Sequence, residues 1–239
     1  MHLLDLTLHA PTENLALDEA LLEAAEAREF SGDILRLWEM TEHTVILGRS
    51  SRAADEVDLS AAKDANVSVL RRSSGGAAVV AGPGCLMYSI IIRYEGREHL
   101  RLLDEVHRHV LGIVRTALGP LIHGVEQLGI CDLAIGGRKF SGNSLRCKRD
   151  HLLYHGTLLY NFDLELVSRL LRMPPRQPAY RGHRSHSDFL ANIPVSIAEL
   201  RSALPASFTA NFSLTNWPRA RTVQLVTSRY SQPAWNLQR

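Results

Sequence analysis

Lysine is scarce in this sequence of 239 residues: it occurs only at Lys63, Lys139 and Lys148, and arginine supplies nearly all the other positive charge. There is no excess of either sign, because 27 Lys and Arg residues face 25 Asp and Glu residues and the formal net charge is +2. This balance argues against a disordered chain and against a protein that binds bulk polyanions, so no nucleic-acid partner is expected. The 45% hydrophobic content suffices for a large buried core.

Cysteine and long apolar runs are also rare. Cys85, Cys131 and Cys147 are odd in number and lack paired metal-ligand spacing. They predict free thiols in a reducing compartment rather than a disulfide framework or a structural metal site. No apolar run is long enough to span a bilayer, and the N-terminus lacks a basic region followed by an apolar core. A soluble, cytoplasmic protein without a membrane partner is expected.

Predicted helices and strands are interspersed along the chain. Apolar residues at helical spacing indicate a helix over 100–118, while 34–39, 67–70 and 85–93 have the composition of strands. Several short strands joined by tight turns favour an α/β (α+β) architecture over a doubly wound sheet. Because no repeat or linker divides the sequence, residues 1–239 are expected to form a single domain.

Two adjacent carboxylates lie in a helix predicted to start after Pro11, with Thr12 as its N-cap. They are Asp18 and Glu19. Adjacent helical residues point in different directions. We therefore interpret these carboxylates as solvated or capping charges rather than as a catalytic pair.

A turn rich in small residues follows the strand at 67–70. It is introduced by Arg71 and Arg72 and runs from Gly75 to Val80. Guanidinium forks and the backbone N–H groups of such a turn can bind a phosphate. The pattern is neither a P-loop nor a Rossmann motif, because no Gly-Lys-Ser/Thr follows and the glycine spacing differs. From these residues alone, an ordinary glycine-rich turn is an equal alternative.

Lys139 lies in a predicted β-hairpin. The first strand is 132–135, the turn is Gly136-Gly137, and alternation on the return strand puts Lys139 and Ser141 on one face. An ammonium held in this way suits a carboxylate or phosphate oxygen that gains charge in a reaction. An exposed hairpin with a solvated lysine is the more common alternative.

Other small motifs extend the pattern. Gly142 beside Asn143 indicates a bulge or a close backbone approach to a ligand, and Gly156 after His155 indicates a second one. A histidine in such a strand is by default a structural hydrogen-bonding group. The arginine- and histidine-rich stretch 176–188 predicts a mobile loop over an anionic ligand or an acidic partner.

Together these stretches resemble the catalytic domain of lipoate–protein ligases, within the wider biotinyl/lipoyl ligase and transferase superfamily. The resemblance rests on residues 71–76, 131–143 and 155–159, and the helix around 15–19 also fits. The order and spacing match over most of the chain. The resemblance implies a central mixed sheet flanked by helices, with a second, smaller sheet beside it.

The resemblance also implies a two-step reaction. Lipoate or octanoate would react with ATP and Mg²⁺ to give an acyl-adenylate. The acyl group would then pass to a lysine of a lipoyl domain, in a 2-oxoacid dehydrogenase E2 or a glycine cleavage H-type protein. Lys139 is implied as the catalytic group, and Asp132 as a contact of Mg²⁺ or the adenylate. The residues implied for ATP and the adenylate are Arg71, Arg72, Gly75, Gly76, Ala77, Ala78, Val79, Val80 and Lys139. Those implied for the acyl acid are Ser73, Lys139, Ser141, Gly142, Asn143, His155 and Gly156.

The sequence departs from the family pattern in several places. Ala77 stands where a third glycine is usual, Ala81 where many members have a histidine, and Cys131 where an asparagine is common. The small C-terminal accessory domain of the longer ligases is not expected within residues 1–239. A separate accessory protein is therefore an expected partner in activation.

Two alternatives remain open from the sequence. Octanoyltransferases of the same superfamily carry the acyl group on a cysteine thiolate without ATP, and Cys85 or Cys131 could do so here. The other alternative, a non-catalytic acyl- or nucleotide-binding module, is opposed by the intact Arg71, Arg72 and Lys139.

Overall fold

The computed structural model describes residues 1–238, and its largest sheet has six strands. These strands are β1 (His2–Asp5), β2 (Ile34–Glu39), β6 (Cys85–Arg93), β10 (Asn143–Cys147), β11 (His151–Leu159) and β12 (Phe212–Ser213). Their order across the sheet is β10-β11-β6-β2-β1-β12. Strand β1 is parallel to β2 and β12, and the other neighbours are antiparallel. The predicted mixed central sheet is confirmed.

Two three-stranded sheets lie beside it. One has the order β4-β3-β5 and consists of β3 (Thr44–Leu47), β4 (Ser68–Arg71) and β5 (Val79–Ala81). The other has the order β7-β8-β9 and consists of β7 (Val125–Leu128), β8 (Asp132–Ile135) and β9 (Arg138–Ser141). The predicted smaller sheet is therefore present, together with a third sheet built on the Lys139 hairpin.

Helices cover both faces of the large sheet. The longer ones are α1 (Pro11–Glu26), α4 (Leu103–Leu118) and α7 (Ile197–Ser207). The shorter ones are α2 (Ala53–Glu56), α3 (Leu59–Asp64), η1 (Glu98–Arg101), α5 (Leu164–Leu170), η2 (Ala179–Arg181), α6 (His186–Phe189), α8 (Arg219–Leu225), η3 (Val226–Tyr230) and α9 (Pro233–Asn236). Within residues 1–238, none of these helices is long and apolar enough to cross a bilayer.

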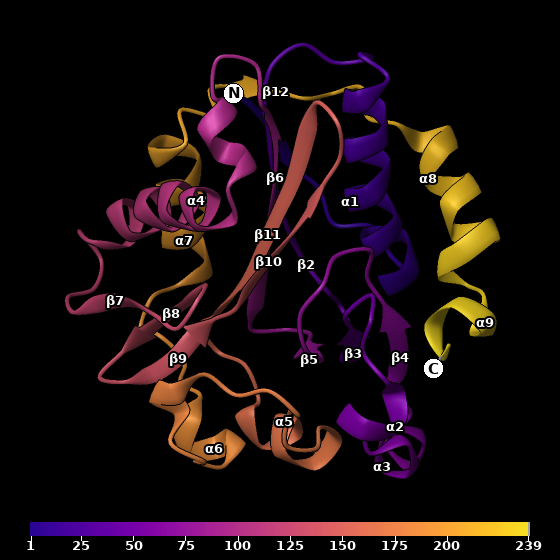
Figure 1. Ribbon diagram of the computed structural model, residues 1–239, viewed down its shortest axis with the longest axis vertical. Helices are drawn as coiled ribbons and strands as arrows, with labels where there is room; N and C mark the ends of the chain where they lie inside the picture. The colour runs from indigo at the N-terminus through magenta and orange to yellow at the C-terminus, as the bar shows by residue number, and fades with distance from the viewer. Residues whose placement is uncertain (239) are drawn as a thin grey trace.

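The alternation of strand β6 decides which helix packs on which face. Leu86, Tyr88, Ile90 and Ile92 belong to the core that includes α4 and α7. Ile91 points the other way, into the core beneath α1. In Figure 1, α4 and α7 accordingly lie on one side of the sheet and α1 on the other, with α8 outside α1.

Local sequence signals locate most elements correctly. The predicted strands 34–39 and 85–93 match β2 and β6, and 67–70 differs from β4 by one residue at each end. The predicted helix 100–118 begins instead as the 3₁₀-helix η1 and continues as α4. The three cysteines are free, as expected.

Helix α1 differs from its prediction at two points. It begins at Pro11 after an N-cap at Ala10, so Thr12 lies inside the helix. The interpretation of Asp18 and Glu19 as solvated charges was wrong, since they are 3% and 0% exposed. The reason is tertiary: α1 packs against β6 and β11 on one side and against α8 and η3 on the other. Two neighbouring helix positions are therefore buried at once.

Glu19 ties the end of the chain to α1. Its Oε1 accepts hydrogen bonds from Arg146 and Arg229, and its Oε2 accepts one from the Tyr230 hydroxyl at 2.6 Å. Burial by itself would raise the pKa of Glu19. The Tyr230 hydrogen bond and the two guanidinium groups outweigh it and hold that pKa below its usual value. The buried group is therefore a carboxylate at neutral pH.

Glu19→Gln is expected to lower the free energy of unfolding by about 3 kcal/mol at pH 7, because it leaves two guanidinium groups facing a neutral amide. Since the pKa of Glu19 is lowered in the folded state, its stabilisation is present above its unfolded pKa of about 4.3 and is lost as the pH falls. The difference between wild type and variant should therefore shrink in acid. Urea unfolding at pH 7 and pH 4 measures both effects.

Glu29→Gln is the control for this substitution. Glu29 pairs with Arg221 of α8 at 2.7 Å, and its side chain is 46% exposed. An exposed pair contributes at most about 1 kcal/mol. Equal losses in the two variants would show that Glu19 has no special role in anchoring the C-terminal helices.

Candidate functional site

A cavity of about 560 Å³ is lined by residues of all three sheets and of the segment between α5 and α6. Much of its wall is apolar, with side chains such as Ile46, Met87, Phe140 and Leu159. The size and the apolar wall are typical of small-molecule sites. Charged side chains enter the cavity at a few positions: Glu56, Arg72, Asp132, Lys139, Arg172, Arg176 and Arg181.

Most of the predicted site residues line this cavity. They are Arg72, Gly76, Ala77, Ala78, Val79, Val80, Asp132, Lys139, Ser141, Gly142, Asn143, His155 and Gly156. Arg71, Ser73 and Gly75 are not among the lining residues. The fold thus brings together three stretches that are far apart in the sequence.

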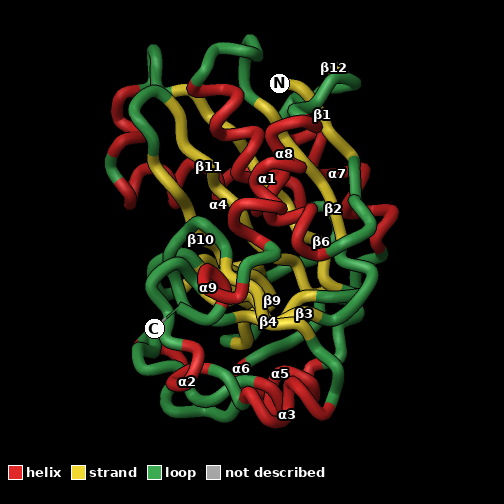
Figure 2. Tube along the Cα trace, turned by 90° about the vertical axis from the view of Figure 1, so that its right-hand side faces the viewer, coloured by secondary structure: helices red, strands yellow, loops and turns green. Residues whose placement is uncertain are grey.

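Arg71 faces away from the cavity and is 0% exposed. Its Nη1 donates to the carbonyls of Gly48 and Ser51 at 2.6 and 2.7 Å. Its Nε and Nη2 donate to the carbonyls of Trp235 and Gln238 at 3.0 and 2.8 Å. Arg71 was predicted to contact the adenylate, but its guanidinium holds the C-terminal segment beside β4, where α9 lies (Figure 2).

Arg72 shapes the turn that follows it. Its Nη2 donates to the carbonyls of Gly75 and Ala77 at 2.6 and 3.0 Å, and its Nη1 donates to the Ile46 carbonyl at 3.1 Å. Burial lowers the pKa of Arg72 to about 10, which Glu56 only partly offsets. Gly76 has φ +88, and a Cβ there would lie 2.8 Å from Nη2 of Arg72. The Arg72 guanidinium therefore holds the turn that begins at Gly75 in shape, and it also lines the cavity.

Sequence reasoning missed Glu56. This residue is 7% exposed, lines the cavity, and accepts the Ala78 N–H on Oε2 at 2.6 Å. That N–H of the predicted phosphate-binding turn is therefore already engaged. Glu56 ends the four-residue helix α2, in which Ala54 and Asp55 are exposed. No sequence pattern around Glu56 therefore predicts that it is buried against the cavity.

Lys139 and Asp132 form an ion pair within the cavity. The distance from Nζ to Oδ1 is 2.7 Å, and the Lys139 side chain is 24% exposed. The Tyr180 hydroxyl donates to Oδ2 of Asp132 at 2.7 Å. Gly142 lets the ammonium approach the backbone closely, because a Cβ there would lie 2.8 Å from Nζ of Lys139 and would displace it. The close approach predicted at Gly142 is made by this ammonium.

Asn143 and Gly156 meet on neighbouring strands. The Tyr88 hydroxyl donates to Oδ1 of Asn143, and Nδ2 of Asn143 donates to the Cys131 carbonyl at 2.7 Å. A Cβ on Gly156 would overlap the Asn143 amide. Glycine is therefore needed opposite Asn143, which in turn orients the chain before Asp132.

The two candidate thiols lie in different surroundings. Cys85 is fully buried in β6 and does not line the cavity, and burial raises its pKa well above the usual range. Cys131 lines the cavity, and its Sγ lies 3.0 Å from the Asn143 carbonyl. Burial and Asp132 raise its pKa, although Lys139 acts in the opposite direction. The surroundings of the two thiols therefore do not activate either of them.

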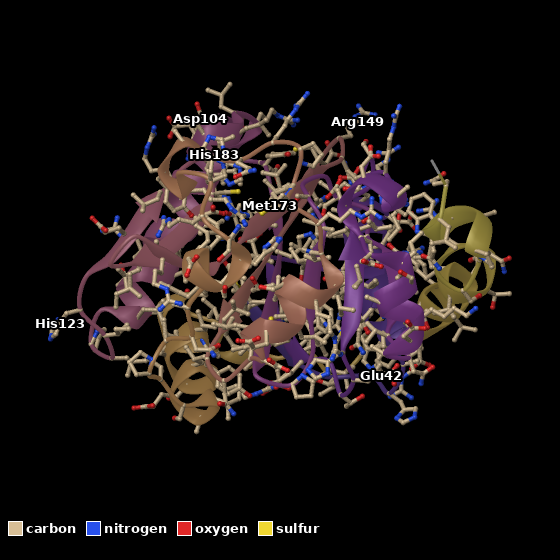
Figure 3. All side chains as sticks on the ribbon, turned by 90° about the horizontal axis from the view of Figure 1, so that it is seen from below. Glu42, Asp104, His123, Arg149, Met173 and His183 are labelled. Carbon is tan, nitrogen blue, oxygen red and sulfur yellow. The ribbon has the colours of Figure 1, made fainter. Side chains whose placement is uncertain are left out.

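Several residues of the arginine- and histidine-rich segment 176–188 line the cavity, among them Arg176 and Arg181. Figure 3 labels His183 within this segment. Arg184 donates through Nη2 to the Gly137 carbonyl at 2.9 Å, and Arg138 donates to the Leu190 carbonyl. Together with Tyr180, these contacts tie the segment to the β8–β9 hairpin.

The sequence that builds this fold and its cavity also matches a family of known proteins. The family model for the lipoyl protein ligase A/B catalytic domain matches residues 10–209. The chain therefore belongs to this family, and the resemblance inferred from its motifs is confirmed.

The relatives within the family carry two kinds of activity in their names. The chain is 28% identical to lipoate–protein ligase 1 of Staphylococcus aureus, over 95% of this chain and 70% of that protein. It is 29% identical to the octanoyltransferase LipM of Symbiobacterium thermophilum, over 97% of this chain and 96% of that protein. This chain covers only 56% and 52% of the lengths of two Mycoplasma relatives, each named a probable lipoate-protein ligase A.

Solved structures show the same fold. One is a bi-partite lipoate protein ligase, studied with its E2 lipoyl domain, from Thermoplasma acidophilum. It has a TM-score of 0.82 at 25% identity and covers 100% of this chain and 97% of that one. A lipoate-protein ligase A bound with ATP has a TM-score of 0.80 at 25% identity, covering 99% and 98%.

Proposed function

We propose that this protein is an ATP-dependent lipoate–protein ligase that uses lipoate or octanoate. The acid and ATP form an acyl-adenylate, and the acyl group then passes to a lysine of a lipoyl domain. The observation that carries the proposal is the Lys139–Asp132 pair in a largely apolar cavity. The ATP-bound neighbour of the same fold supports the choice of nucleotide.

The first step brings two anions together. An oxygen of the acyl carboxylate attacks the α-phosphorus, the bond to the bridging oxygen breaks, and pyrophosphate leaves. Lys139, already fixed by Asp132 and Gly142, would neutralise charge that grows on the α-phosphate. A preorganised donor of this kind contributes about 3–4 kcal/mol to a transition state. In the second step the acceptor amine attacks the acyl carbon and AMP leaves.

Asp132 and Glu56 are the carboxylates that line the cavity among the described residues. This chemistry fits Mg²⁺, which usually binds one or two carboxylates together with substrate phosphates. Asp132 would hold the ion when a ligand occupies Lys139, and the ion would supply neutralisation of the triphosphate. Tyr180 would keep the Asp132 carboxylate oriented throughout.

The proposed acceptor is a lipoyl domain of an E2 or glycine cleavage H-type protein. A second polypeptide that supplies an accessory domain is a further proposed partner. Both proposals draw on the Thermoplasma acidophilum neighbour, which is bi-partite and was studied with its E2 lipoyl domain. The deciding assay combines the protein with labelled octanoate or lipoate, ATP and a lipoyl domain, with and without the accessory protein. Acyl transfer that is indifferent to ATP would rule out the ligase.

The alternative is an octanoyltransferase, favoured by the near-complete coverage of the LipM relative. Cys131 is then the acyl carrier, since it lines the cavity. Its thiol would need to become a thiolate when a donor protein binds, because burial and Asp132 raise its pKa.

Replacing Cys85 and Cys131 together by alanine is expected to leave most of the ATP-dependent activity, since no covalent acyl-enzyme is required. Packing losses should lower the free energy of unfolding by about 1–2 kcal/mol. Cys147→Ala, at an exposed thiol, is the control. Mass spectrometry after incubation with an acylated donor protein tests the alternative. A hydroxylamine-labile adduct on Cys131, formed without ATP, would overturn the ligase proposal.

A further inference from the structure

Four polar residues form a row across the large sheet. Arg36 of β2 lies opposite Ser89 of β6, Ser89 opposite His155 of β11, and His155 opposite Ser144 of β10. Residues directly opposite on paired strands lie on the same face. Asp18 of α1 covers this row, with Oδ1 2.6 Å from Nη1 of Arg36 and Oδ2 2.6 Å from Oγ of Ser89.

The row is buried, and buried polar groups lower the stability of the fold unless they form hydrogen bonds. Asp18 is 3% exposed, Arg36 0% and Ser89 2%. Burial alone would raise the pKa of Asp18, but Arg36, His155 and Ser89 outweigh it and lower that pKa. A buried ion pair contributes little net stability over apolar packing. A role in the neighbouring site therefore accounts for buried Asp18 and His155 better than stability does.

The row reaches the cavity through His155. Nδ1 of His155 lies 3.5 Å from Oδ2 of Asp18, and Nε2 lies 2.6 Å from Oγ of Ser74. The Ser74 oxygen also accepts the Nε–H of Arg72 at 3.1 Å. The hydroxyl proton of Ser74 can then be donated to Nε2 of His155. A neutral His155 that accepts this proton on Nε2 carries its ring proton on Nδ1, facing the Asp18 carboxylate.

We propose that Asp18, His155 and Ser74 form a relay of positioning residues that fixes the direction of the Arg72 fork. Asp18 selects the tautomer of His155, His155 accepts the Ser74 proton, and the Ser74 oxygen is thereby turned toward Nε of Arg72. Ser144 completes the arrangement at the end of the row. Its hydroxyl donates at 2.9 Å to the Gly75 carbonyl, which Arg72 also holds. Helix α1 thus sets the shape of the turn that lines the cavity.

The relay rests on the proposed function only in the identity of the ligand, because each of its contacts is made within the protein. The first test is therefore made without ligand, on wild-type protein labelled with ¹⁵N-histidine, at pH 8. The expected spectrum has the His155 proton on Nδ1, with Nε2 unprotonated. A His155 proton on Nε2 would falsify the relay, and this measurement needs no variant to fold.

The second test compares two buried serines, Ser74→Ala and Ser89→Ala, which are 1% and 2% exposed in the wild type. Each substitution removes one hydroxyl bonded to the network, but only Ser74 joins His155 to Arg72. Ser74→Ala should weaken binding of a non-hydrolysable octanoyl-adenylate analogue about tenfold, as expected for one charge-assisted hydrogen bond. Ser89→Ala should change it less than twofold and keep the His155 proton on Nδ1.

Equal losses of affinity in the two variants, or none in Ser74→Ala, would contradict the relay. If wild-type protein fails to bind the analogue, the proposed function fails, and the tautomer of His155 still decides the relay. If Ser74→Ala does not fold, the wild-type spectrum decides alone.

Discussion

Lys139→Ala should reduce acyl-adenylate formation by at least about a hundredfold while the protein stays folded, because a preorganised cation at a developing oxyanion contributes about 3–4 kcal/mol. The hairpin that holds it should survive, since its turn depends on Gly136 and Gly137, which have φ values of 54° and 71°. Exchange of ³²P-pyrophosphate into ATP with octanoate measures the first step directly. Unfolding in urea reports the fold.

Lys63→Ala is the matched control, since Lys63 is exposed on α3 and does not line the cavity. Lys139→Arg adds a second comparison, because arginine keeps the charge but replaces a compact ammonium by a planar fork. We expect it to recover only a small part of the rate. Near-normal adenylate formation by folded Lys139→Ala would remove Lys139 from the mechanism.

Arg72→Ala should weaken binding of ATP and of an acyl-adenylate analogue about a hundredfold, and that of the free acid much less. The substitution removes the donors that hold the carbonyls of Ile46, Gly75 and Ala77, and charged hydrogen bonds of this kind contribute about 1.5–3 kcal/mol each. The turn assigned to the nucleotide then loses its shape. Calorimetry with each ligand separates the two effects.

Arg72→Lys tests whether charge or geometry matters at this position. Lysine keeps the charge but cannot hold several carbonyls in one plane. Binding close to wild type in Arg72→Lys would show that the turn needs only a cation. Equal losses for nucleotide and free acid in Arg72→Ala would contradict the assignment of this turn to the adenylate.

Short-range patterns in the sequence are enough to predict most of the individual strands and helices of this protein. Strand β6 and most of α4 are visible as apolar patterns, and the Lys139 hairpin follows from two glycines between short strands. Such signals act over a few residues, so they survive in a sequence read without a structure. Most of the site residues that the family motifs implied likewise line the cavity, because each motif is a short stretch whose side chains keep their order in the fold.

The tertiary structure alone decided which charged groups meet. Tyr180 reaches Asp132 from 48 residues away, and Arg229 reaches Glu19 from 210 residues away. No local pattern encodes such pairs. Of two adjacent arginines, Arg71 at the end of β4 binds the C-terminal segment, while Arg72, the residue after this strand, faces the cavity. Which of the two faces the cavity depends on how the sheets pack, and that is a property of the whole chain.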